Sequence, residues 1–484
     1  MDRDAATPVI DRPVTPAAVP GDVLTLFSVL WAFANLFHVW GPSGRATAVF
    51  SEVTTVAVTH VLIGVAALAV LLKPRSTIRL AVLAALGPIS LWFEAPFLGS
   101  HWLVASLVDV AILLAVVVAR ADRARVERAF LPAARWVLLG FYSFAAFSKL
   151  NNAFFTPRVS CGNYFFDELS GSLGVTIHSA TAGWWSHLVP LGTAAIELSV
   201  PLLLLFRRTR VAGVIVGLVF HSFIALDQTH LFSDFSSVLN ALFTLFLPAA
   251  FATSVLASYR SLSASARDGL RAVAVLGAAG LLLMQWYGKG TTVQRLFADG
   301  RAWAWVVLDG LLLYLVARFV LACRSLRSDV DLRVRGWMWI LPLLVVFNGL
   351  APYLEIRTAY AFNMYSNLET AGGDTNQFLV PRTLPVTDYQ TDLVSVITSS
   401  DPGLQLYATQ QFDIPFLQLR DYLSHHPDVA LTYRRGGQIH QVAHASDDPS
   451  LVEPVPSWES KFFAFRSLDE TTPNRCQPAF LPAL

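Results

Sequence analysis

Charged residues are scarce in this sequence. Of its 484 residues only 14% are Asp, Glu, Lys or Arg, whereas 54% are hydrophobic and the mean hydropathy is +0.52. Soluble domains carry about a quarter charged residues, so a chain of this size lacks the polar surface that would keep it in water. The formal net charge of +1 argues against a nucleic-acid partner. The composition therefore favours an integral membrane protein whose main partner is the lipid bilayer.

Several catalytic motifs are also missing. The sequence contains no phosphate-binding Gly-rich loop, no GxSxG, no CxxC pair and no HExxH. The nine-residue step from His221 to His230 places these two histidines on different faces of a helix, which does not suit a metal ion. We therefore expect no metal site.

Long apolar runs fill the first three quarters of the chain. An α-helix needs roughly 20 apolar residues to cross a bilayer, where the backbone must satisfy its own hydrogen bonds. The runs therefore predict about eleven transmembrane helices, the third interrupted by Gly87 and Pro88. Residues 1–20 contain four prolines and charges of both signs, which predicts a disordered cytoplasmic tail rather than a signal peptide. The expected spans are 22–40, 54–72, 77–95, 101–119, 131–150, 184–206, 211–229, 232–256, 270–287, 303–322 and 336–353.

Lys and Arg are unevenly distributed among the short loops. Because positively charged loops stay in the cytoplasm, the bias places the N-terminus inside and the C-terminal part outside the plasma membrane. The polar loop at 151–183 lies on the outer side, and its length is typical of functional loops. The Lys- and Arg-rich loops alternate with loops that hold few of either, and lie at 73–79, 120–128, 207–210, 260–271 and 318–335.

Residues 354–484 are expected to form a separate extracytoplasmic domain that is small, α+β and rich in strands. Asp413 resembles an N-cap that opens the helix IPFLQLRDYLSHH. VALTYRRGGQIHQVA is typical of a hairpin with the two glycines in its turn, and 461–468 predicts a further strand. The predicted fold class is thus an all-α polytopic membrane bundle over 21–353, followed by this domain.

Three cysteines are too few for a disulfide framework. Under the predicted topology Cys161 and Cys476 both face the oxidising exterior, whereas Cys323 lies at the cytoplasmic end of the tenth helix. A Cys161–Cys476 disulfide would clamp the tail onto the membrane body. Two free buried thiols are the other interpretation, because cysteine pairing cannot be deduced from sequence alone.

Ionisable residues inside membrane helices are costly, so each is a candidate for function. Lys149 ends the fifth helix among aromatic and aliphatic residues, where desolvation would favour a neutral amine that acts as a base. His221 lies inside the seventh helix and His101 opens the fourth. All three map to the outer half of the membrane and are our candidate catalytic residues. Their alternative roles are structural: the lysine can extend its ammonium to the headgroups, and the histidines can serve in packing.

Other polar residues of the helical region fall into two groups. One group shares the outer level of the candidate site, where a solvated surface at the helix ends is the simpler interpretation: Glu94, Asp227, His230 and Asp234. The other group lies deeper: Asp109, Glu197 and Asn240. These three are expected either to form hydrogen-bonded pairs between helices or to line a path for protons or ions.

The segments around two candidate residues resemble a known family. FYSFAAFSKLNNAFF, which contains Lys149, and FHSFIALDQTHLFSDFSSVLNALFTLFLP, which contains His221, look like the transmembrane module of vitamin K-dependent γ-glutamyl carboxylases. The bacterial relatives of these enzymes are called horizontally transferred transmembrane (HTTM) proteins. The resemblance covers roughly residues 20–350, and the tail segment 362–381 looks like one that follows the module in bacterial members.

The resemblance implies a quinol-dependent enzyme, a lyase of the carboxylase type. In the family, a lysine of this motif acts as base on a reduced naphthoquinone such as vitamin K or menaquinol. Oxygen then gives an epoxide through a strongly basic alkoxide, which removes a γ-proton from a substrate glutamate before CO2 is captured. Lys149 matches that lysine, His221 matches a histidine of the FH segment, and His101 resembles another near the pocket. A dry, outward-facing pocket suits this chemistry because water would quench the base.

The sequence departs from the vertebrate enzymes at several points. Ser148 stands where they have a second lysine, Ser100 stands where they have an asparagine, and the tail is much shorter than their luminal part. Quinone binding is therefore a more transferable inference than carboxylation of a protein substrate on the outer side. Two other functions compete: a transporter that uses the deeper polar residues, and a non-catalytic membrane protein whose outer domain binds a partner.

Overall fold

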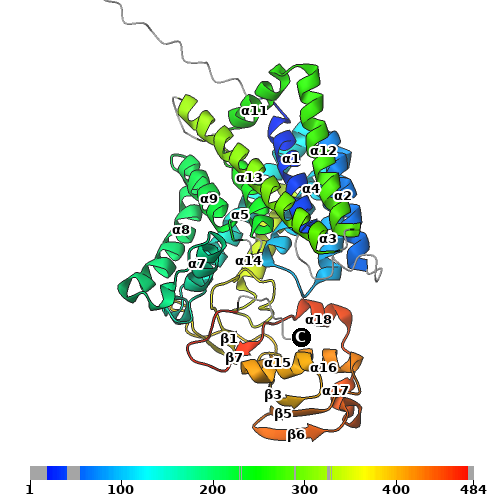
Figure 1. Cartoon of the computed structure of the whole chain (residues 1–484), viewed down its shortest axis with the longest axis vertical. Coiled ribbons are helices and arrows are strands. Elements are labelled where there is room, and N and C mark those ends of the chain that lie inside the picture. Colours follow the sequence, from blue (N-terminus) through cyan, green and yellow to red (C-terminus); the bar gives the residue numbers. More distant parts are fainter. Residues whose placement is uncertain are drawn as a thin grey trace, which may run out of the picture.

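The computed structural model describes residues 19–40, 55–227, 229–230, 232–287, 290–323, 328 and 330–477. Most of the tail expected at 1–20, and the end of the expected C-terminal domain, lie outside the described residues. The chain is mostly helical, with a small sheet in its C-terminal part (Figure 1). The helices of the first part are α1 (Asp22–Val39), α2 (Thr55–Leu72), α3 (Thr77–Glu94), α4 (Ser100–Val118), α5 (Arg123–Ser148), α6 (Asn152–Phe155), α7 (Cys161–Ser172), α8 (Leu188–Leu205), α9 (Arg210–Ile224), α10 (Ser233–Thr244), α11 (Ala249–Ser261), α12 (Ala264–Tyr287), α13 (Thr291–Ala322) and α14 (Ile340–Leu350).

All eleven predicted apolar spans are helical, but fewer are long enough to cross a membrane. Among the described residues, eight helices have the length and apolar composition for a crossing, or nine if one bent pair counts as a single span. The seventh and eleventh predicted spans, α9 and α14, are shorter apolar helices. The structure thus contains eight or nine helices of membrane length where the sequence predicts eleven.

The bent pair consists of α10 and α11, between which the helix axis bends by 106°. Pro248, the N-cap residue of α11, has no N–H group with which to continue the helix. The Arg135 guanidinium donates a hydrogen bond to the carbonyl of Leu245 at 2.8 Å, and the Ser328 hydroxyl donates to that of Phe246 at 3.1 Å. Protein partners of this kind allow a helix to break inside an apolar body.

The interruption predicted at Gly87 and Pro88 is wrong, because α3 is continuous through both residues. Gly87 instead permits a close approach between α3 and α4, since a Cβ at this position would lie 2.0 Å from a carboxylate oxygen of Asp109. The same carboxylate accepts a hydrogen bond from Trp31 Nε1 on α1 at 2.8 Å. Three helices therefore meet at one buried polar contact.

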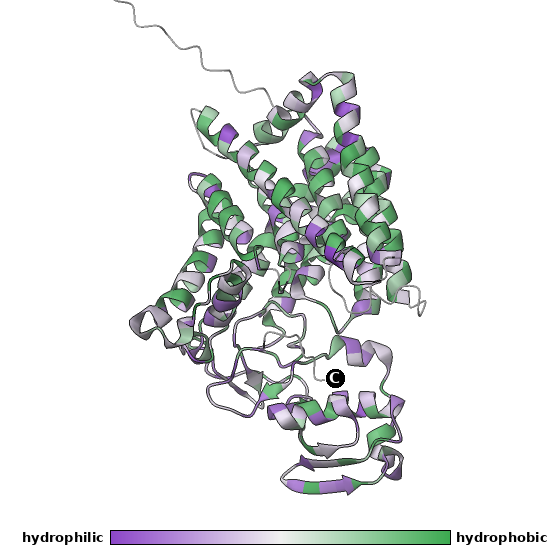
Figure 2. Ribbon diagram, in the orientation of Figure 1, coloured by the Kyte–Doolittle hydropathy of each residue, from purple (hydrophilic) through white to green (hydrophobic). Residues whose placement is uncertain are grey.

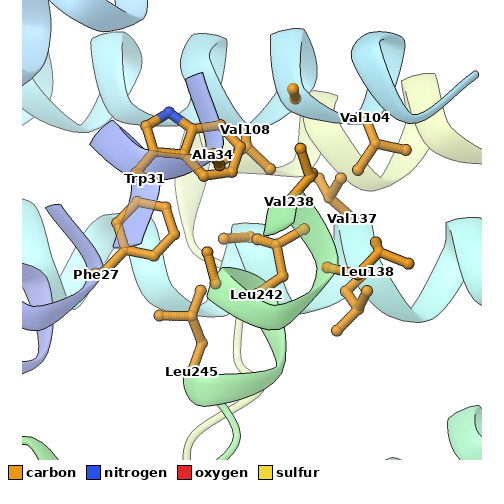
Figure 3. Close-up of a cluster of buried hydrophobic side chains, with 14 of the residues drawn as sticks. Phe27, Trp31, Ala34, Val104, Val108, Val137, Leu138, Val238, Leu242 and Leu245 are labelled. Atoms are coloured by element: carbon orange, nitrogen blue, oxygen red, sulfur yellow. The ribbon is translucent and has the colours of Figure 1, made fainter. Parts of the chain in front are cut away.

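The core of the helical body lies where α1, α4, α5 and α10 converge. Their apolar side chains interdigitate, so close apolar packing holds these helices together. Figure 3 shows this cluster, with Phe27, Trp31 and Ala34 from α1, Val104 and Val108 from α4, Val137 and Leu138 from α5, and Val238 and Leu242 from α10.

The outer surface of the helical body is apolar as well (Figure 2). On α12 and α13, large apolar side chains are exposed, among them Val273 at 72%, Leu276 at 70% and Leu321 at 84%. Apolar patches of this extent are rare on soluble monomers but match the hydrocarbon of a bilayer. The helical body is therefore compatible with a multi-pass membrane protein.

The first residues of α1 lie at the end of the helical body away from the C-terminal sheet (Figure 1), and arginines from several loops bind there. Arg75 and Arg260 form ion pairs with Asp22 at the start of α1, at 3.3 and 2.7 Å. Arg123 donates to the Thr25 hydroxyl one turn further along α1. These arginines belong to three of the loops that the sequence marks as Arg-rich, so the structure collects these loops at one end of the body.

The C-terminal part contains a five-stranded antiparallel sheet in the order β6-β5-β3-β4-β7. Apolar residues of the strands form a second core with α15, α16 and α17, separate from the core of the helical body. Its elements are β3 (Leu393–Ser399), α15 (Pro402–Gln410), β4 (Phe412–Pro415), α16 (Phe416–His425), β5 (Leu431–Arg435), β6 (Gln438–Val442), α17 (Pro449–Val452), α18 (Ser457–Phe462) and β7 (Leu468–Asp469); a two-stranded ribbon of β1 (Thr370–Ala371) and β2 (Asp374–Thr375) precedes them.

Some predictions for the C-terminal part are confirmed and others are wrong. The hairpin of β5 and β6 is confirmed, and Gly436 and Gly437 in its turn have φ of 58° and 78°, which glycine adopts without strain. The predicted helix is present as α16, but Asp413 lies in β4 and does not cap it. The strand predicted at 461–468 is wrong: α18 covers its start, and β7 begins only at its last residue.

The segment after α14 packs on the helical body and explains this last difference. Ala359, Phe362 and Ala464 belong to the same apolar cluster as the helices. The backbone N–H groups of Thr358 and Ala359 both donate to the carbonyl of Ala464. Residues near 464 therefore bind the segment after α14 instead of extending the sheet.

Glu369 gives the C-terminal part a pH dependence that can be tested. Burial, reinforced by the carboxylates of Asp469 and Asp413, raises the pKa of Glu369 from its ordinary value of 4.5 to about 7. The folded state therefore holds a proton that the unfolded state releases, and stability is lost as the pH rises from 4.5 through 7. We expect Glu369→Gln to be more stable than the wild type above pH 7 by about 1–3 kcal/mol, and equally stable at pH 4.5. Thermal melts of both proteins across this range would show it, and parallel curves would contradict it.

Candidate functional site

A cavity of about 150 Å³ lies between α5, α7, α8, α9 and the segment that follows α14. Its polar side chains are few, and we call it the aromatic cavity. Concave sites of this composition are typical of binding sites for small organic molecules. The polar lining consists of Lys149, Thr193, Glu197, His221 and Asp227, and the aromatic lining of Phe141, Tyr142, Phe154, Phe165, Phe166, Phe220, Phe223, Phe232, Phe235 and Tyr365.

Lys149 directly follows α5, and its ammonium points into the aromatic cavity. Its Nζ lies 2.8 Å from a carboxylate oxygen of Glu197 on α8, and the two side chains are only 7% and 13% exposed. The ammonium also lies near the carbonyl oxygens of Ala145 and Met364, at 3.3 and 3.4 Å. An adjacent carboxylate favours the charged form of an amine. Lys149 and Glu197 thus form a buried ion pair, a partner for the lysine that the sequence does not predict.

His221 faces the same cavity from α9. Its Nε2 is hydrogen-bonded to the hydroxyl of Tyr142 at 3.0 Å, and its Nδ1 lies 3.3 Å from the hydroxyl of Ser236. That serine hydroxyl also donates to the backbone carbonyl of His221 at 3.0 Å. Both ring nitrogens therefore have partners, which hold the imidazole in place beside Tyr142.

His101 lies outside the lining of the aromatic cavity. Its Nε2 is 3.3 Å from Asp234, which also accepts a hydrogen bond from Trp102 Nε1 at 3.0 Å. The ring of Phe235 contacts both His101 and His221, with centroid distances of 5.4 and 5.0 Å. Of the three candidate catalytic residues, the structure thus brings Lys149 and His221 to one cavity and places His101 behind its aromatic wall.

A second acid, Asp227, lines the cavity shortly after the end of α9. Asp227 is buried, and one of its oxygens lies 2.9 Å from His230 Nδ1. Its other oxygen accepts hydrogen bonds from the backbone N–H groups of Thr229 and His230, and these bonds stabilise the turn that follows α9. The ring of His230 packs on Phe165. These residues form part of a cavity wall rather than the solvated surface that we expected from the sequence.

The tail segment 362–381 closes the aromatic cavity on the side of the sheet. Asn151 donates to the carbonyl of Ser366 at 2.6 Å, and Asn367 accepts a hydrogen bond from the backbone of Cys161 at 2.8 Å. Gln377 donates to the carbonyl of Phe147 at the end of α5. These amide side chains hold Met364 and Tyr365 against the cavity, so the tail contributes part of the site.

A disulfide joins Cys161 and Cys476, which are 315 positions apart in the sequence. Cys161 is the first residue of α7 and lines the aromatic cavity, while Cys476 lies near the end of the described chain. Of the two interpretations that the sequence left open, the structure contains the bridge. Cys323 is not disulfide-bonded.

The deeper polar residues do not form one continuous path. Asp109 binds Trp31, Glu197 binds Lys149, and Asn240 donates to Asp309 at 2.9 Å. Each of these contacts joins different helices, as expected for interhelical pairs. Among the outer group, Glu94 does not reach the aromatic cavity and instead contacts two histidines on α1 and α2.

Several site residues were not predicted from the sequence. Tyr142 and Phe235 are ordinary aromatic residues in apolar runs, and only their position in the fold shows that they contact His221. The sequence places Glu197 in the deeper group, and its partner Lys149 belongs to a different helical segment, so the pair is not visible in the sequence. A carboxylate within an apolar run is a usable signal, since a buried charge needs a partner.

The chain matches no protein-family model, no curated protein and no solved structure. The function is therefore argued from the residues of the site.

Proposed function

We propose that the protein is a multi-pass membrane enzyme that binds a reduced quinone in the aromatic cavity and removes a proton from one of its hydroxyl groups. One observation carries the proposal: the buried Lys149–Glu197 pair lies inside a cavity whose walls are otherwise mostly aromatic or aliphatic. A flat ring system with one or two hydroxyl groups has the shape and polarity that such a cavity accommodates.

The residues present fit a quinol in two respects. The aromatic side chains offer faces and edges for stacking on a flat ring. The polar atoms are gathered on Lys149, Glu197 and the His221–Tyr142 pair, so a hydroxyl group can find both a donor and an acceptor there. A bound quinol would supply the reducing electrons of the reaction with oxygen.

The ion pair assigns the roles of the two charged residues differently from the family resemblance. Glu197 is the proton acceptor, because its carboxylate is already ionised beside an ammonium. Lys149 stabilises the negative oxygen that deprotonation creates, since a fixed positive charge in a site with little water acts strongly. The Tyr142 hydroxyl orients the ligand, and His221 holds that hydroxyl in place through its hydrogen bond. The closed tail excludes water, which favours these electrostatic contacts.

The membrane location rests on the apolar helices and their apolar outer surface. We propose that the Arg-rich end of the helical body is cytoplasmic and that the aromatic cavity and the sheet face the exterior of the plasma membrane. The Cys161–Cys476 disulfide supports this orientation, because disulfides persist in oxidising compartments. A quinol dissolved in the bilayer could then reach the cavity from the lipid.

Filling the cavity provides a direct test. Ala145 lines the aromatic cavity on α5, and Ala145→Phe would place an aromatic ring inside it without removing a polar group. We expect the purified wild type, given menaquinol and oxygen, to convert one quinol and one dioxygen into one quinone epoxide and one water. Ala145→Phe should lower this rate by at least about tenfold, because the ligand can no longer reach the ion pair. Mass spectrometry of the extracted quinones gives the rates, and bicarbonate with a glutamate peptide can be added to test for carboxylation.

Ser143→Phe is the matched control, because Ser143 lies on the same helix with its side chain exposed. This variant should keep the rate of the wild type. Absence of both quinol binding and turnover in the folded wild type would overturn the proposal, as would an unaffected Ala145→Phe variant.

A transporter is the competing function, and the break between α10 and α11 is the observation that favours it, since broken helices often line transport sites. The break is, however, occupied by Arg135, which is 5% exposed and donates to the freed carbonyl of Leu245. That carbonyl is therefore already satisfied by the protein. For this reason we place the catalytic function first.

A further inference from the structure

Three ligand-type side chains converge outside the aromatic cavity, each from a different helix. His38 lies near the end of α1, His60 lies on α2, and Glu94 is the last residue of α3. The Nε2 atoms of both histidines lie 3.2 Å from the same Glu94 carboxylate oxygen. The exposed fractions of the three side chains are 8%, 1% and 11%.

We propose that His38, His60 and Glu94 bind a divalent first-row transition metal ion. Two imidazoles and one carboxylate form a donor set that such ions prefer. The three candidate ligand atoms all lie within 4.8 Å of one another. Zinc–ligand bonds of about 2.1 Å place two neighbouring ligands about 3.4 Å apart in tetrahedral geometry and about 3.0 Å apart in octahedral geometry. The two distances of 3.2 Å lie between these values.

The charge balance of the cluster also favours a cation. Within the described residues, the ion-pair partners found for Glu94 are the two histidines, and a Ser90 hydroxyl donates to the same oxygen. No guanidinium or ammonium of the described chain pairs with this carboxylate. A buried carboxylate is costly unless a positive group compensates it, and a divalent ion would do so while leaving both imidazoles neutral.

The cluster borders a space for one more small ligand. A space of about 10 Å³ is lined by His38, Ser90, Glu94 and Trp102. This volume is close to the minimum that holds one water molecule. Three protein ligands and one water make up the coordination of many zinc sites. A water molecule in this space would be the fourth ligand.

The surroundings connect this site to the wall of the aromatic cavity. The His38 ring stacks on Trp102, with 3.5 Å between ring centroids. Trp102 Nε1 donates to Asp234, the residue that also contacts His101. A metal ion would therefore fix α1, α2 and α3 to one another and hold the Trp102 side of the bundle in place. The inference does not depend on the proposed function of the cavity.

Metal analysis of the full-length protein tests the site. The protein would be purified in detergent through a tag without histidines, and its metal content measured by inductively coupled plasma mass spectrometry. We expect about one divalent ion per chain, or saturable binding of one Zn²⁺ after treatment with a chelator. The element found, zinc or iron among others, identifies the ion. Added Zn²⁺ should also raise the melting temperature of the chelated wild type, because an ion that binds only the folded state stabilises it.

Glu94→Gln and His60→Ala are the test variants, and Glu94→Gln preserves the side-chain volume if the alanine variant does not fold. Both should lose the bound ion and the Zn²⁺-dependent melting shift. The double variant His425→Ala/His426→Ala, which removes two exposed histidines at the end of α16, should retain both the bound ion and the melting shift. A metal-free wild type without saturable binding would overturn the proposal. So would a folded Glu94→Gln variant that binds as the wild type does, or loss of binding in the surface double variant.

Discussion

Lys149→Met is expected to abolish quinol turnover and to lower the melting temperature, whereas Lys149→Met/Glu197→Leu should recover the melting temperature without recovering turnover. The single change leaves the Glu197 carboxylate buried beside a methionine. Breaking a buried pair in this way costs about 3–5 kcal/mol, while replacing both partners by apolar groups is often neutral. The pair is 7% and 13% exposed, so solvent screens it only slightly.

This comparison separates a structural from a catalytic role. If the pair only stabilised the fold, the double variant would regain both stability and activity. A proton-transfer role requires the charged groups themselves, so activity should stay lost by at least about a hundredfold. Melting temperature and product formation would be measured on the same preparations. Arg420→Met serves as the control, because it breaks the exposed pair with Glu453 and should change neither quantity much. Full turnover in the double variant would exclude Glu197 as the base.

Cys476→Ser should lower the melting temperature of the protein and loosen the tail over the aromatic cavity. The Cys161–Cys476 bridge closes a loop of more than three hundred residues, and removing a disulfide typically costs 2–5 kcal/mol. Met364 and Tyr365 line the cavity from the segment that this bridge secures. Limited proteolysis should therefore cut the variant faster between residues 362 and 477, and quinol turnover should fall because water enters the site.

The mutation is placed at Cys476 because Cys161 itself lines the cavity. Treatment of the wild type with a reductant should reproduce the effect. Cys323→Ser is the matched control, since Cys323 is not disulfide-bonded, and it should melt as the wild type does. Equal melting temperatures with and without reductant, together with equal proteolysis, would contradict the prediction.

The helical nature of the first part can be predicted from the sequence alone, because long apolar runs that cross a bilayer must satisfy their own backbone hydrogen bonds. The sequence also determined the hairpin at Gly436 and Gly437, where the turn chemistry is local. It pointed to Lys149 and His221, since ionisable groups in apolar runs stand out. The positions of helix breaks cannot be predicted in this way. Pro88 lies inside a continuous helix. The helix that breaks is the one before Pro248, where Arg135 and Ser328 donate hydrogen bonds to the free backbone carbonyls.

Which polar side chains contact one another depends on the tertiary structure and cannot be predicted from the sequence. Glu197 comes from a helix about fifty residues after Lys149 and turns an expected neutral amine into one half of an ion pair. His38 and His60 were overlooked because each is a single histidine in an apolar helix, and their convergence on Glu94 depends on the packing of three helices. Contacts of this kind depend on how the helices pack in space, which local sequence patterns do not encode. The interactions of each ionisable side chain depend in turn on the partner that this packing brings to it.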